Sequence, residues 1–328
     1  MKTLILGRQD VSELLNMQDT MSAVEEAYKA FSMNLVVQPP IVSIDVPKHN
    51  GELDIKSCYS KTNESITVKT AVGFWDNQAS YNLPTLLATI ILYDAKNGFP
   101  LCIMDGSLIT AYRTGAAGGL SAKLLARPDS KTVGMIGAGG QARMQVRAIK
   151  EVLPIETIKV WAQSHRESEQ YKNDIESSMG IKVIICTTPD EAIENSDIVV
   201  TTTPSKQAIV KAKSIKSGTH IIAIGADMEG KQELDPMLFK NAKIVVDSIA
   251  QCLQRGETRN PFIAGIISEK DIHAEIGELL LSTKYSREDN VEITIFDSTG
   301  MGIQDNTVAR MVYDRAIELD KGQFLDLV

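Results

Sequence analysis

The sequence predicts an α/β fold in which a Rossmann-type, doubly wound parallel sheet is inserted into an α+β domain. A length of 328 residues is more than one hydrophobic core usually organises, so two domains are expected. Apolar strand-like runs alternate with helical stretches between residues 131 and 248, an order typical of a parallel sheet. The last helical stretch follows a final strand and is expected to return to the first domain.

The first domain is expected to combine one long helix with several strands. Residues 17–33 place Met21, Val24 and Tyr28 on one face at helical spacing. Proline and glycine punctuate the alternating pattern that follows, which predicts strands joined by turns. These strand segments are residues 36–60, 66–74, 86–94 and 101–105.

The second domain is predicted to follow a helix at residues 110–126, which is rich in small residues. The apolar strands after it are residues 131–136, 155–163, 181–187, 196–203, 219–227, 242–248 and 292–297. The helix after the last strand carries Val308, Met311, Val312 and Ala316 on one face. We therefore expect residues 1–120 and 305–328 to form one domain and residues 121–304 to form the inserted one.

Composition and charge exclude several classes of protein. Hydrophobic residues make up 43% and charged residues 23% of the chain, so it can bury a core. Lys and Arg number 34 against 42 Asp and Glu, which gives a net charge of −8. An acidic protein is not expected to bind nucleic acid, because contacts to phosphates need a basic surface. Arg8 and Asp10 interrupt the apolar N-terminal run, so we expect neither signal peptide nor membrane association, and a cytoplasmic location. The 4 histidines form no HxxxH or HExxH pair, and no metal site is expected.

A glycine turn follows the strand at residues 131–136 and opens a helix, the context in which a dinucleotide-binding motif occurs. The first glycine permits a tight turn, the second lets backbone approach a pyrophosphate, and the alanine permits close helix-to-strand packing. Helix N–H groups would face the anion. The motif has the form GxGxxA and consists of Gly137, Ala138, Gly139, Gly140, Gln141 and Ala142. We predict that residues 121–304 form a dinucleotide-binding domain, with an ordinary tight turn as the alternative.

The residues that would hold the adenosine ribose follow the next strand, and the expected acid is absent there. Ala162 and Gln163 occupy the strand end and are followed by Ser164, His165 and Arg166. An acid at the strand end favours NAD, whereas a basic or hydroxyl-bearing loop can hold the 2'-phosphate of NADP. The predicted cofactor is therefore NAD or NADP, with a slight preference for NADP. The alternative for His165 and Arg166 is a solvated loop.

Three charged residues stand where a reaction could use them. Lys69 lies between apolar strand residues, where burial would lower its pKa and make it a proton carrier or carboxylate partner. Arg113 offers a planar fork for a carboxylate or phosphate. Asp227 ends a strand at the expected carboxyl edge of the sheet, where it could deprotonate a substrate ammonium. The alternatives are an exposed strand face for Lys69, a structural ion pair for Arg113 and a turn-forming role for Asp227.

A set of motifs runs in order along almost the full chain: VQPP, ITAYRTGAAGG, MIGAGGQA, VVTTTPS, SGTHIIAIGADMEGKQELDP and EITIFDSTGMGIQD. Together they resemble the ornithine cyclodeaminase and µ-crystallin family, and within it the archaeal-type alanine dehydrogenases. The resemblance implies a Rossmann domain inserted into a substrate and dimerisation domain, and a homodimer that acts on a small-molecule amino or imino acid.

The resemblance also implies roles for individual residues. Lys69 would touch the substrate and take part in proton transfer, and Arg113 would lie between substrate and cofactor. Asp227 would be the acid–base residue, and Thr299 would face the substrate. The residues that would face the cofactor are Thr85, Gln141, Thr202, Lys231 and Ser298.

Two positions depart from the pattern of the family. The family commonly has a basic residue directly after its proline pair, where this sequence has Ile41. Its MPA motif is replaced by Lys56, Ser57 and Cys58. Because a flexible ammonium can reach a carboxylate from another strand, Lys56 is predicted to bind the substrate.

The sequence leaves three functions open, of which the first is favoured. The first function is that of an NAD(P)-dependent oxidoreductase, which acts at the α-carbon of a small amino or imino acid as an alanine dehydrogenase or ketimine reductase does. The second is a cyclodeaminase, in which the hydride returns, ammonia leaves and net redox is zero. Asp54 would then hold a distal ammonium, or else be a solvent-facing turn residue. The third is a non-enzymatic NADP-dependent binding protein.

Overall fold

The computed structural model describes residues 2–327 and divides the chain into two compact units. The first unit extends to Arg113 and resumes at Met301, and the second comprises Thr114–Gly300. The boundaries between the units, at 113/114 and 300/301, therefore lie a few residues before the predicted domain boundaries at 120/121 and 304/305. Within the described residues, no helix is both long enough and apolar enough to span a membrane.

Close helix packing explains why the second unit begins at Thr114, inside helix α4 (Gly106–Leu125). A Cβ atom added to Gly115 would lie 2.8 Å from the carbonyl oxygen of Met144, so the two backbones are in contact. Gln145 donates from its side-chain amide to the carbonyl of Thr114 at 2.9 Å. The part of α4 that begins at Thr114 therefore packs against α5 and belongs to the second unit.

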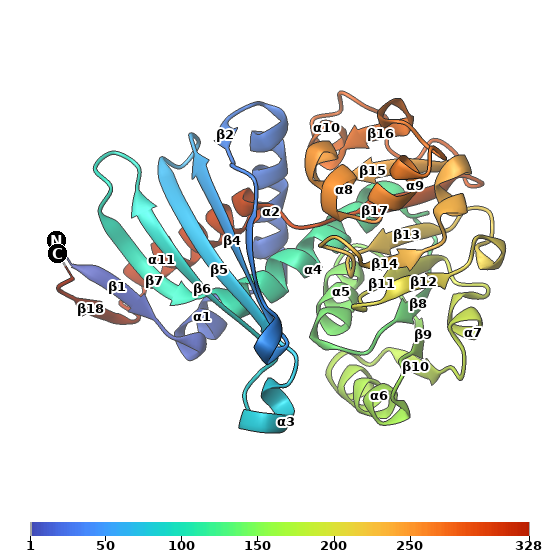
Figure 1. The fold of residues 1–328 in the computed structure, drawn as a ribbon, viewed down its shortest axis with the longest axis horizontal. Helices are drawn as coiled ribbons and strands as arrows, with labels where there is room; N and C mark the ends of the chain where they lie inside the picture. The colour runs from blue at the N-terminus through green and yellow to red at the C-terminus, as the bar shows by residue number, and fades with distance from the viewer. Residues whose placement is uncertain (1, 328) are drawn as a thin grey trace. The chain divides into compact units, whose positions relative to one another are not determined.

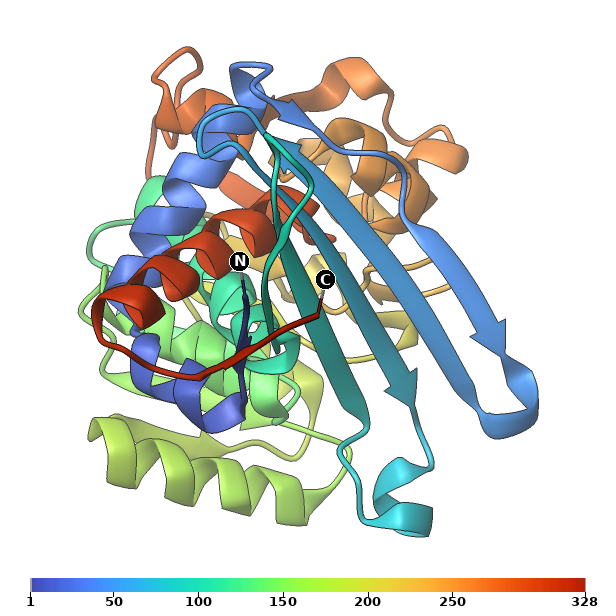
Figure 2. The same cartoon turned by 90° about the vertical axis from the view of Figure 1, so that its left-hand side faces the viewer.

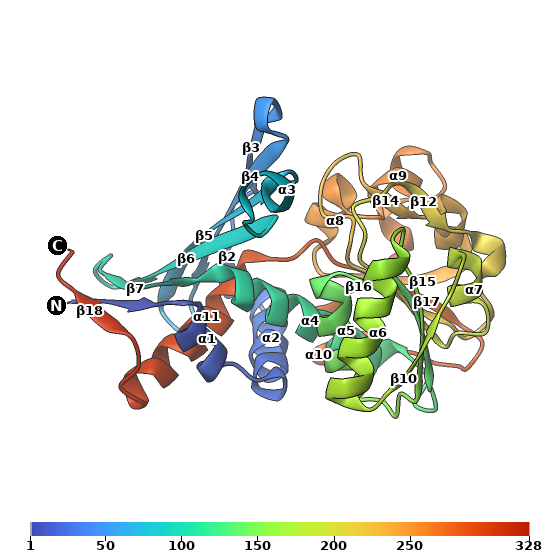
Figure 3. The same cartoon turned by 90° about the horizontal axis from the view of Figure 1, so that it is seen from below.

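The first unit contains an eight-stranded sheet of order β18-β1-β7-β6-β5-β4-β2, with β3 paired to β4. Its strands are β1 (Thr3–Leu6), β2 (Val36–Val37), β3 (Val42–Val46), β4 (Gly51–Ser60), β5 (Ser65–Phe74), β6 (Leu86–Asp94), β7 (Pro100–Asp105) and β18 (Gln323–Leu325). Neighbouring strands are antiparallel except β1 and β7, and Figure 3 shows β1 beside β18. The strands expected at residues 36–60, 66–74, 86–94 and 101–105 are thus confirmed.

Three helices cover one face of this sheet (Figures 1 and 2): α1 (Arg8–Leu14), α2 (Met17–Ser32) and α11 (Gly302–Glu318). Helix α2 confirms the helix predicted at residues 17–33, and it buries Met21, Val24 and Tyr28. The short helix α3 (Asn77–Tyr81), which the sequence did not predict, lies between β5 and β6. Side chains alternate along β4, so Lys56, Cys58 and Ser60 lie on the buried face that meets α11.

The second unit contains an eight-stranded, fully parallel sheet of order β10-β9-β8-β11-β13-β17-β15-β16. Its strands are β8 (Thr132–Ile136), β9 (Thr157–Trp161), β10 (Lys182–Ile185), β11 (Ile198–Thr201), β13 (His220–Ala223), β15 (Ala242–Val246), β16 (Ile272–Glu275) and β17 (Ile293–Asp297). All seven predicted strands of this domain are present, and β16 is additional. The strand order reverses between β8 and β11, which is where doubly wound folds bind ligands.

Helices lie on both faces of this parallel sheet, as the fold class predicts. Figure 3 shows α5 (Gly140–Lys150) and α6 (His165–Met179) on one face. The other face packs against α7 (Pro189–Ile193), α8 (Ile249–Arg255) and the strand pair β12 (Lys206–Val210) and β14 (Gln232–Leu234). The remaining helices are α9 (Arg259–Ile263) and α10 (Ile276–Leu280). The doubly wound α/β prediction is confirmed.

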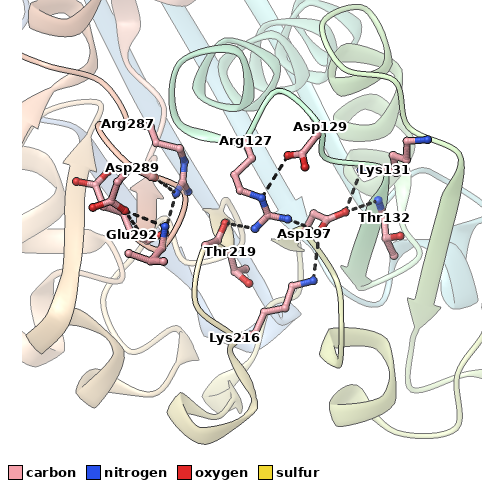
Figure 4. Close-up of polar contacts among 12 residues, drawn as sticks. Arg127, Asp129, Lys131, Thr132, Asp197, Lys216, Thr219, Arg287, Asp289 and Glu292 are labelled. Atoms are coloured by element: carbon pink, nitrogen blue, oxygen red, sulfur yellow. Dashed lines mark hydrogen bonds and ion pairs between the residues drawn. The ribbon is translucent and has the colours of Figure 1, made fainter.

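A network around Asp197 ties together the amino ends of the central strands (Figure 4). The Asp197 carboxylate accepts from Arg127 at 2.6 Å, from Lys216 at 3.2 Å, and from the backbone N–H groups of Lys131 and Thr132 at 2.9 and 3.0 Å. Burial favours its neutral form, but these donors hold the pKa of Asp197 below the ordinary value of 3.8. The network lies at the opposite edge of the sheet from the glycine turn.

We predict that Asp197→Asn destabilises the protein by about 2–4 kcal/mol, because it leaves a partly buried guanidinium and ammonium without their counter-charge. The loss is present above pH 3.8 and disappears as pH falls through the lowered pKa of Asp197. Urea unfolding measures it. Asp129→Asn is the matched control, since Asp129 pairs with the same Arg127 but is 80% exposed. An equal loss in both variants would contradict the assigned role of Asp197.

Candidate functional site

The glycine turn has the geometry of an anion-binding turn. Gly137 has φ of +106°, a conformation that side chains disfavour, and its N–H donates to the carbonyl of Trp161 at 2.8 Å. Gly139 is the N-cap of α5 and supplies no side-chain cap. No atom lies within 4 Å of a Cβ built on Gly139 or Gly140, so open space adjoins the first N–H groups of α5. Ala142 is fully buried.

A cavity of about 330 Å³ adjoins this turn, within the size range of ligand sites. Its lining comes from the glycine turn, the end of β9, the first turn of α6 and the loop after β11. The lining residues are Gly137, Ala138, Gly139, Trp161, Ala162, Gln163, Glu167, Thr202, Thr203, Pro204, Ser205 and Ile209. The cavity therefore lies at the carboxyl ends of the strands where the strand order reverses.

Among the residues that were expected to face a cofactor, Gly137, Ala138, Gly139 and Thr202 line this cavity. Thr202 lines it, and its N–H donates to the carbonyl of Ile136 at 3.0 Å. Gln141 lies in the first turn of α5. Ser164 caps α6, with its hydroxyl accepting from the N–H of Glu167 at 3.4 Å. His165, whose side chain is 73% exposed, lies 3.6 Å from Glu169.

His165 and Arg166 are not among the residues that line the cavity, and neither is Ser164. The lining at this point is instead Ala162, Gln163 and Glu167. Thr85, which was also expected at the cofactor, lies in the first unit directly before β6, where its carbonyl accepts from the N–H of Phe74 at 2.9 Å.

Two buried glutamates hold the loops that follow β11 and β13. Glu233 accepts from the N–H and hydroxyl of Thr203 at 2.6 and 2.7 Å and from the N–H of Gly225 at 3.0 Å. Glu257 accepts from the N–H groups of Glu233 and Leu234 at 2.5 and 3.1 Å. Burial raises the pKa of Glu233 to about 7, and burial together with Glu233 and Asp297 raises that of Glu257. These two acids therefore act as scaffolds for the rim of the cavity.

Asp247 organises the loop after β17. Its carboxylate accepts from the hydroxyl of Ser298 at 2.8 Å and from the N–H of Gly300 at 2.7 Å. The hydroxyl of Thr299 accepts from the side-chain amide of Gln251 at 2.8 Å. Ser298 and Thr299 are both buried, and their hydroxyls form hydrogen bonds within the second unit.

Asp227 and Lys231, which were predicted separately, form an ion pair in the loop after β13. The Lys231 ammonium lies 2.7 Å from the Asp227 carboxylate, whose side chain is 47% exposed. The backbone carbonyl of Asp227 accepts from Arg255 at 3.0 Å. Arg255 therefore fixes the backbone of Asp227, and the carboxylate stays accessible at the carboxyl edge of the sheet.

In the first unit, Lys69 and Arg113 meet at Asp305, a residue that sequence reasoning missed. The Lys69 ammonium lies 2.6 Å from one carboxylate oxygen of Asp305, and both side chains are 1% exposed. Arg113 donates to the other oxygen at 3.2 Å. Lys69 also donates to the Thr110 hydroxyl at 3.2 Å. Lys69 is therefore buried rather than on an exposed strand face, and Arg113 does take part in an ion pair.

Lys56 belongs to the same charged cluster. It lies directly across from Lys69 in the pairing of β4 with β5 and is 8% exposed. Asp54, two residues earlier in β4, lies on the same face of the strand and accepts from the Ser43 hydroxyl at 2.5 Å. The turn position that was considered for Asp54 is wrong, because the residue is inside a strand.

The charges of this cluster shift one another's pKa values. Burial, together with the nearby charges of Arg113 and Lys56, lowers the pKa of Lys69 to about 7, although Asp305 opposes the shift. Burial favours neutral Asp305, but Lys69, Arg113 and Lys56 hold its pKa below the ordinary value. A lysine that titrates near neutral pH can both donate and accept a proton in that range.

The acids that sequence reasoning missed were marked by weak signals. Asp297 ends β17 and Asp247 directly follows β15, whereas the prediction that Asp227 ends its strand is wrong, because β13 stops at Ala223. Glu167 comes three residues after Ser164, the spacing of an N-cap residue and its first-turn acid. Asp305 is in the first turn of α11, within a motif that the resemblance already included. Within residues 2–327, no His, Cys, Asp and Glu side chains are grouped so that they could hold a metal ion.

The sequence and the fold of this chain are similar to those of known proteins. A model of the ornithine cyclodeaminase/mu-crystallin family matches residues 1–320. The alanine dehydrogenase of Archaeoglobus fulgidus is 40% identical over 326 residues, 98% of each chain. A solved archaeal alanine dehydrogenase dimer with bound NAD has a TM-score of 0.94 and 39% identity over 100% of both chains. The Δ(1)-pyrroline-2-carboxylate reductase of Thermococcus litoralis, solved with NADH and L-proline, has a TM-score of 0.95 and 36% identity over 98% of this chain and 99% of that one.

We predict that Asp305→Asn destabilises the protein by about 3–5 kcal/mol near pH 6, because it leaves Lys69 and Arg113 buried without a counter-charge. The loss shrinks as pH rises through about 7, where Lys69 can lose its proton. Urea unfolding at several pH values measures both effects. Asp314→Asn is the control, since Asp314 lies in the same helix and pairs with Arg310 but is 54% exposed. A pH-independent loss would argue against the coupling of Lys69 to Asp305.

Proposed function

The chain belongs to the ornithine cyclodeaminase/mu-crystallin family, and we propose that it is an NAD(P)-dependent oxidoreductase acting at the α-carbon of a small amino or imino acid. The observation that carries the proposal is the buried ammonium of Lys69, which lies 2.6 Å from Asp305 and whose lowered pKa suits proton exchange with a substrate. The dinucleotide-type turn of the second unit supports it, as do the reductase and dehydrogenase relatives.

The residues around the glycine turn fit a bound nicotinamide dinucleotide. Space adjoins Gly139 and Gly140, and the first N–H groups of α5 carry the positive end of the helix dipole, which suits a pyrophosphate. A side chain at Gly137 would collide with the hydroxyl of Thr202 at 2.7 Å. When bound, the cofactor would accept a hydride from the α-carbon of an amino acid or supply one to an imino acid.

Oxidation of an amino acid releases one proton besides the hydride, and reduction of an imino acid takes one up. We assign this proton to Lys69, which Asp305 holds in place and Thr110 contacts. Asp305 and Gln304 accept from Nε and Nη1 of Arg113 at 3.2 and 3.4 Å, and the other N–H groups of the guanidinium would bind a substrate carboxylate. Asp227 would hold the substrate ammonium, and its ion pair with Lys231 would position its carboxylate.

Lys56 supplies the substrate-binding charge that Ile41 lacks. It lies opposite Lys69 on the buried face of the sheet, so a carboxylate bound there would meet ammonium groups from two adjacent strands. Thr299 would contribute a hydroxyl to the substrate, positioned by Gln251. In this proposal the first unit binds the acid group of the substrate and the second holds the cofactor.

A second candidate function is cyclodeamination of a diamino acid. Asp54 favours it, because its carboxylate lies on the same strand face as Lys56, two residues or about 7 Å along β4. An α-carboxylate on Lys56 would then leave a distal ammonium within reach of Asp54. The hydride would return to the ring imine, and ammonia would leave without net redox.

The homodimer is also a proposal. The face of the first unit's sheet that the helices do not cover carries apolar side chains from β3, β4 and β6, including exposed Val42, Ile44 and Leu87. Such a patch is typical of a protein–protein interface, and the archaeal alanine dehydrogenase of known structure is a dimer. Sedimentation equilibrium tests this: a monomer at micromolar concentration would contradict it.

An assay that follows cofactor oxidation and ammonia together tests the proposed function. The protein is given NADH or NADPH with pyruvate plus ammonia and with cyclic imino acids, and NAD or NADP with amino acids and diamino acids. Oxidation or reduction of one cofactor molecule for each substrate molecule consumed supports the oxidoreductase. Ammonia released from a diamino acid without net cofactor turnover would establish the cyclodeaminase instead.

We predict that kcat/KM for reduction falls as pH rises through about 7, because Lys69 loses the proton that it must donate. Lys69→Arg removes this ionisation, since a guanidinium stays protonated, and lowers kcat/KM by roughly 10²- to 10⁴-fold. The pH profile of both proteins is the measurement. Lys61→Arg, at an exposed lysine of the same unit, serves as control and keeps the profile of the parent.

Lys56→Met is expected to raise KM for the amino or imino acid roughly tenfold or more, because it removes one charge that faces the substrate carboxylate. The affinity for the dinucleotide, measured by titration, should not change. Lys48→Met, at an exposed lysine close by in the chain, is the control. An unchanged KM in Lys56→Met would refute the assignment of Lys56.

A further inference from the structure

We propose that Glu167 makes the cofactor site select NAD(H) over NADP(H), by accepting from the 2'-hydroxyl of the adenosine ribose and repelling a 2'-phosphate. This inference rests on the proposed dinucleotide-binding function. It reverses the slight preference for NADP drawn from Ser164, His165 and Arg166, because the cavity is lined by different side chains from those.

The charge of the cavity carries the argument. Among its lining residues, all within the described part of the chain, Glu167 is the one charged side chain. Gln163 beside it is neutral and can bond a ribose hydroxyl from its amide. A 2'-phosphate brings nearly two negative charges and three acceptor oxygens, so it needs cationic donors and would meet a carboxylate here.

Local helix geometry explains how an acid in α6 can reach the ribose, although the end of β9 carries no acid. The usual acid would occupy the strand end, where Ala162 and Gln163 stand. Ser164 caps α6, and Glu167 follows in its first turn. Side chains of a helix tilt toward its N-terminus, so Glu167 extends back over the segment that leaves β9. The first turn of α6 therefore presents its carboxylate at the cavity.

Arg143 fixes α6 against the glycine turn and is itself committed. From α5, its guanidinium donates to the carbonyls of Ala138 and Gly139 at 2.6 and 3.0 Å. It also donates to Asp174 of α6 at 3.0 and 2.6 Å and lies 5.2 Å from the ring centre of Tyr171. One side chain thus links the pyrophosphate turn to the helix that carries Glu167. Because its donors are in use, Arg143 offers little to a 2'-phosphate.

The two basic residues that could have served NADP are not placed for it. His165 lies beside Glu169 and is largely exposed. Arg166 is also exposed and does not line the cavity. A dianion about 5 Å from a carboxylate at the protein surface is disfavoured strongly enough to expect at least a hundredfold preference for NADH.

Calorimetric titration of the full protein with NADH and with NADPH tests the proposal through binding alone. The parent should bind NADH at least about a hundredfold more tightly than NADPH, and Glu167→Gln should reduce this ratio about tenfold or more, chiefly by tightening NADPH. The double variant Gln163→Arg with Glu167→Gln should bring the two affinities closer still. Added salt should lower the ratio in the parent more than in Glu167→Gln, because salt screens the repulsion.

Glu169→Gln is the matched control, since it removes the same charge from the same exposed stretch of α6 outside the cavity, and it should keep the ratio of the parent. Thermal unfolding of each variant checks that α6 remains folded. Equal affinity of the parent for NADH and NADPH, or equal ratios in Glu167→Gln and Glu169→Gln, would overturn the role of Glu167 while leaving dinucleotide binding intact. Binding of neither dinucleotide by the parent would overturn the proposed function as well.

Discussion

The buried carboxylate of Asp305 is the interaction on which the proposed chemistry depends. A lysine and an arginine cannot both be buried without a counter-charge, since the desolvation of each ion costs several kcal/mol. Asp305 meets the two cations through different oxygens, so one acid fixes the positions of both Lys69 and Arg113. Asp305 offsets only part of the cost of burying Lys69, because burial and the neighbouring cations still lower the pKa of Lys69 to about 7. The same cluster therefore provides both a fixed cation and an exchangeable proton.

The second unit uses buried acids in a different way. Glu233 and Asp247 accept from backbone N–H groups and hydroxyls of the loops after β11, β13 and β17, and Glu257 accepts from the backbone of β14, which carries Glu233. These loops follow the carboxyl ends of parallel strands, where a doubly wound sheet binds its ligand. Each buried N–H or hydroxyl that these acids accept from would otherwise lack a partner, so the hydrogen bonds give irregular loops a defined shape. A rigid rim is what a cofactor site needs, because loops without internal support would have to be ordered by the ligand.

The features predicted correctly from the sequence are those encoded locally. Apolar runs of strand length identified β8, β11 and β13, and the glycine turn before α5 identified the switch point of the sheet. Asp305 escaped notice because its role depends on a partner more than two hundred residues away in the chain, at Lys69. Glu167 escaped because the acid was sought at the strand end, whereas it lies one helical turn later. Residue type and spacing predicted the elements, but not which charges meet across them.

Transfer of deuterium tests the central claim most directly. The protein is incubated with reduced cofactor carrying deuterium at the transferable C4 position, an imino acid or an oxo acid with ammonia, and the product is analysed by mass spectrometry and NMR. The account predicts an amino acid labelled at its α-carbon, with oxidised cofactor formed in equal amount. Product that carries no deuterium from the cofactor, or no product with any acid of this class although the dinucleotide binds, would contradict it.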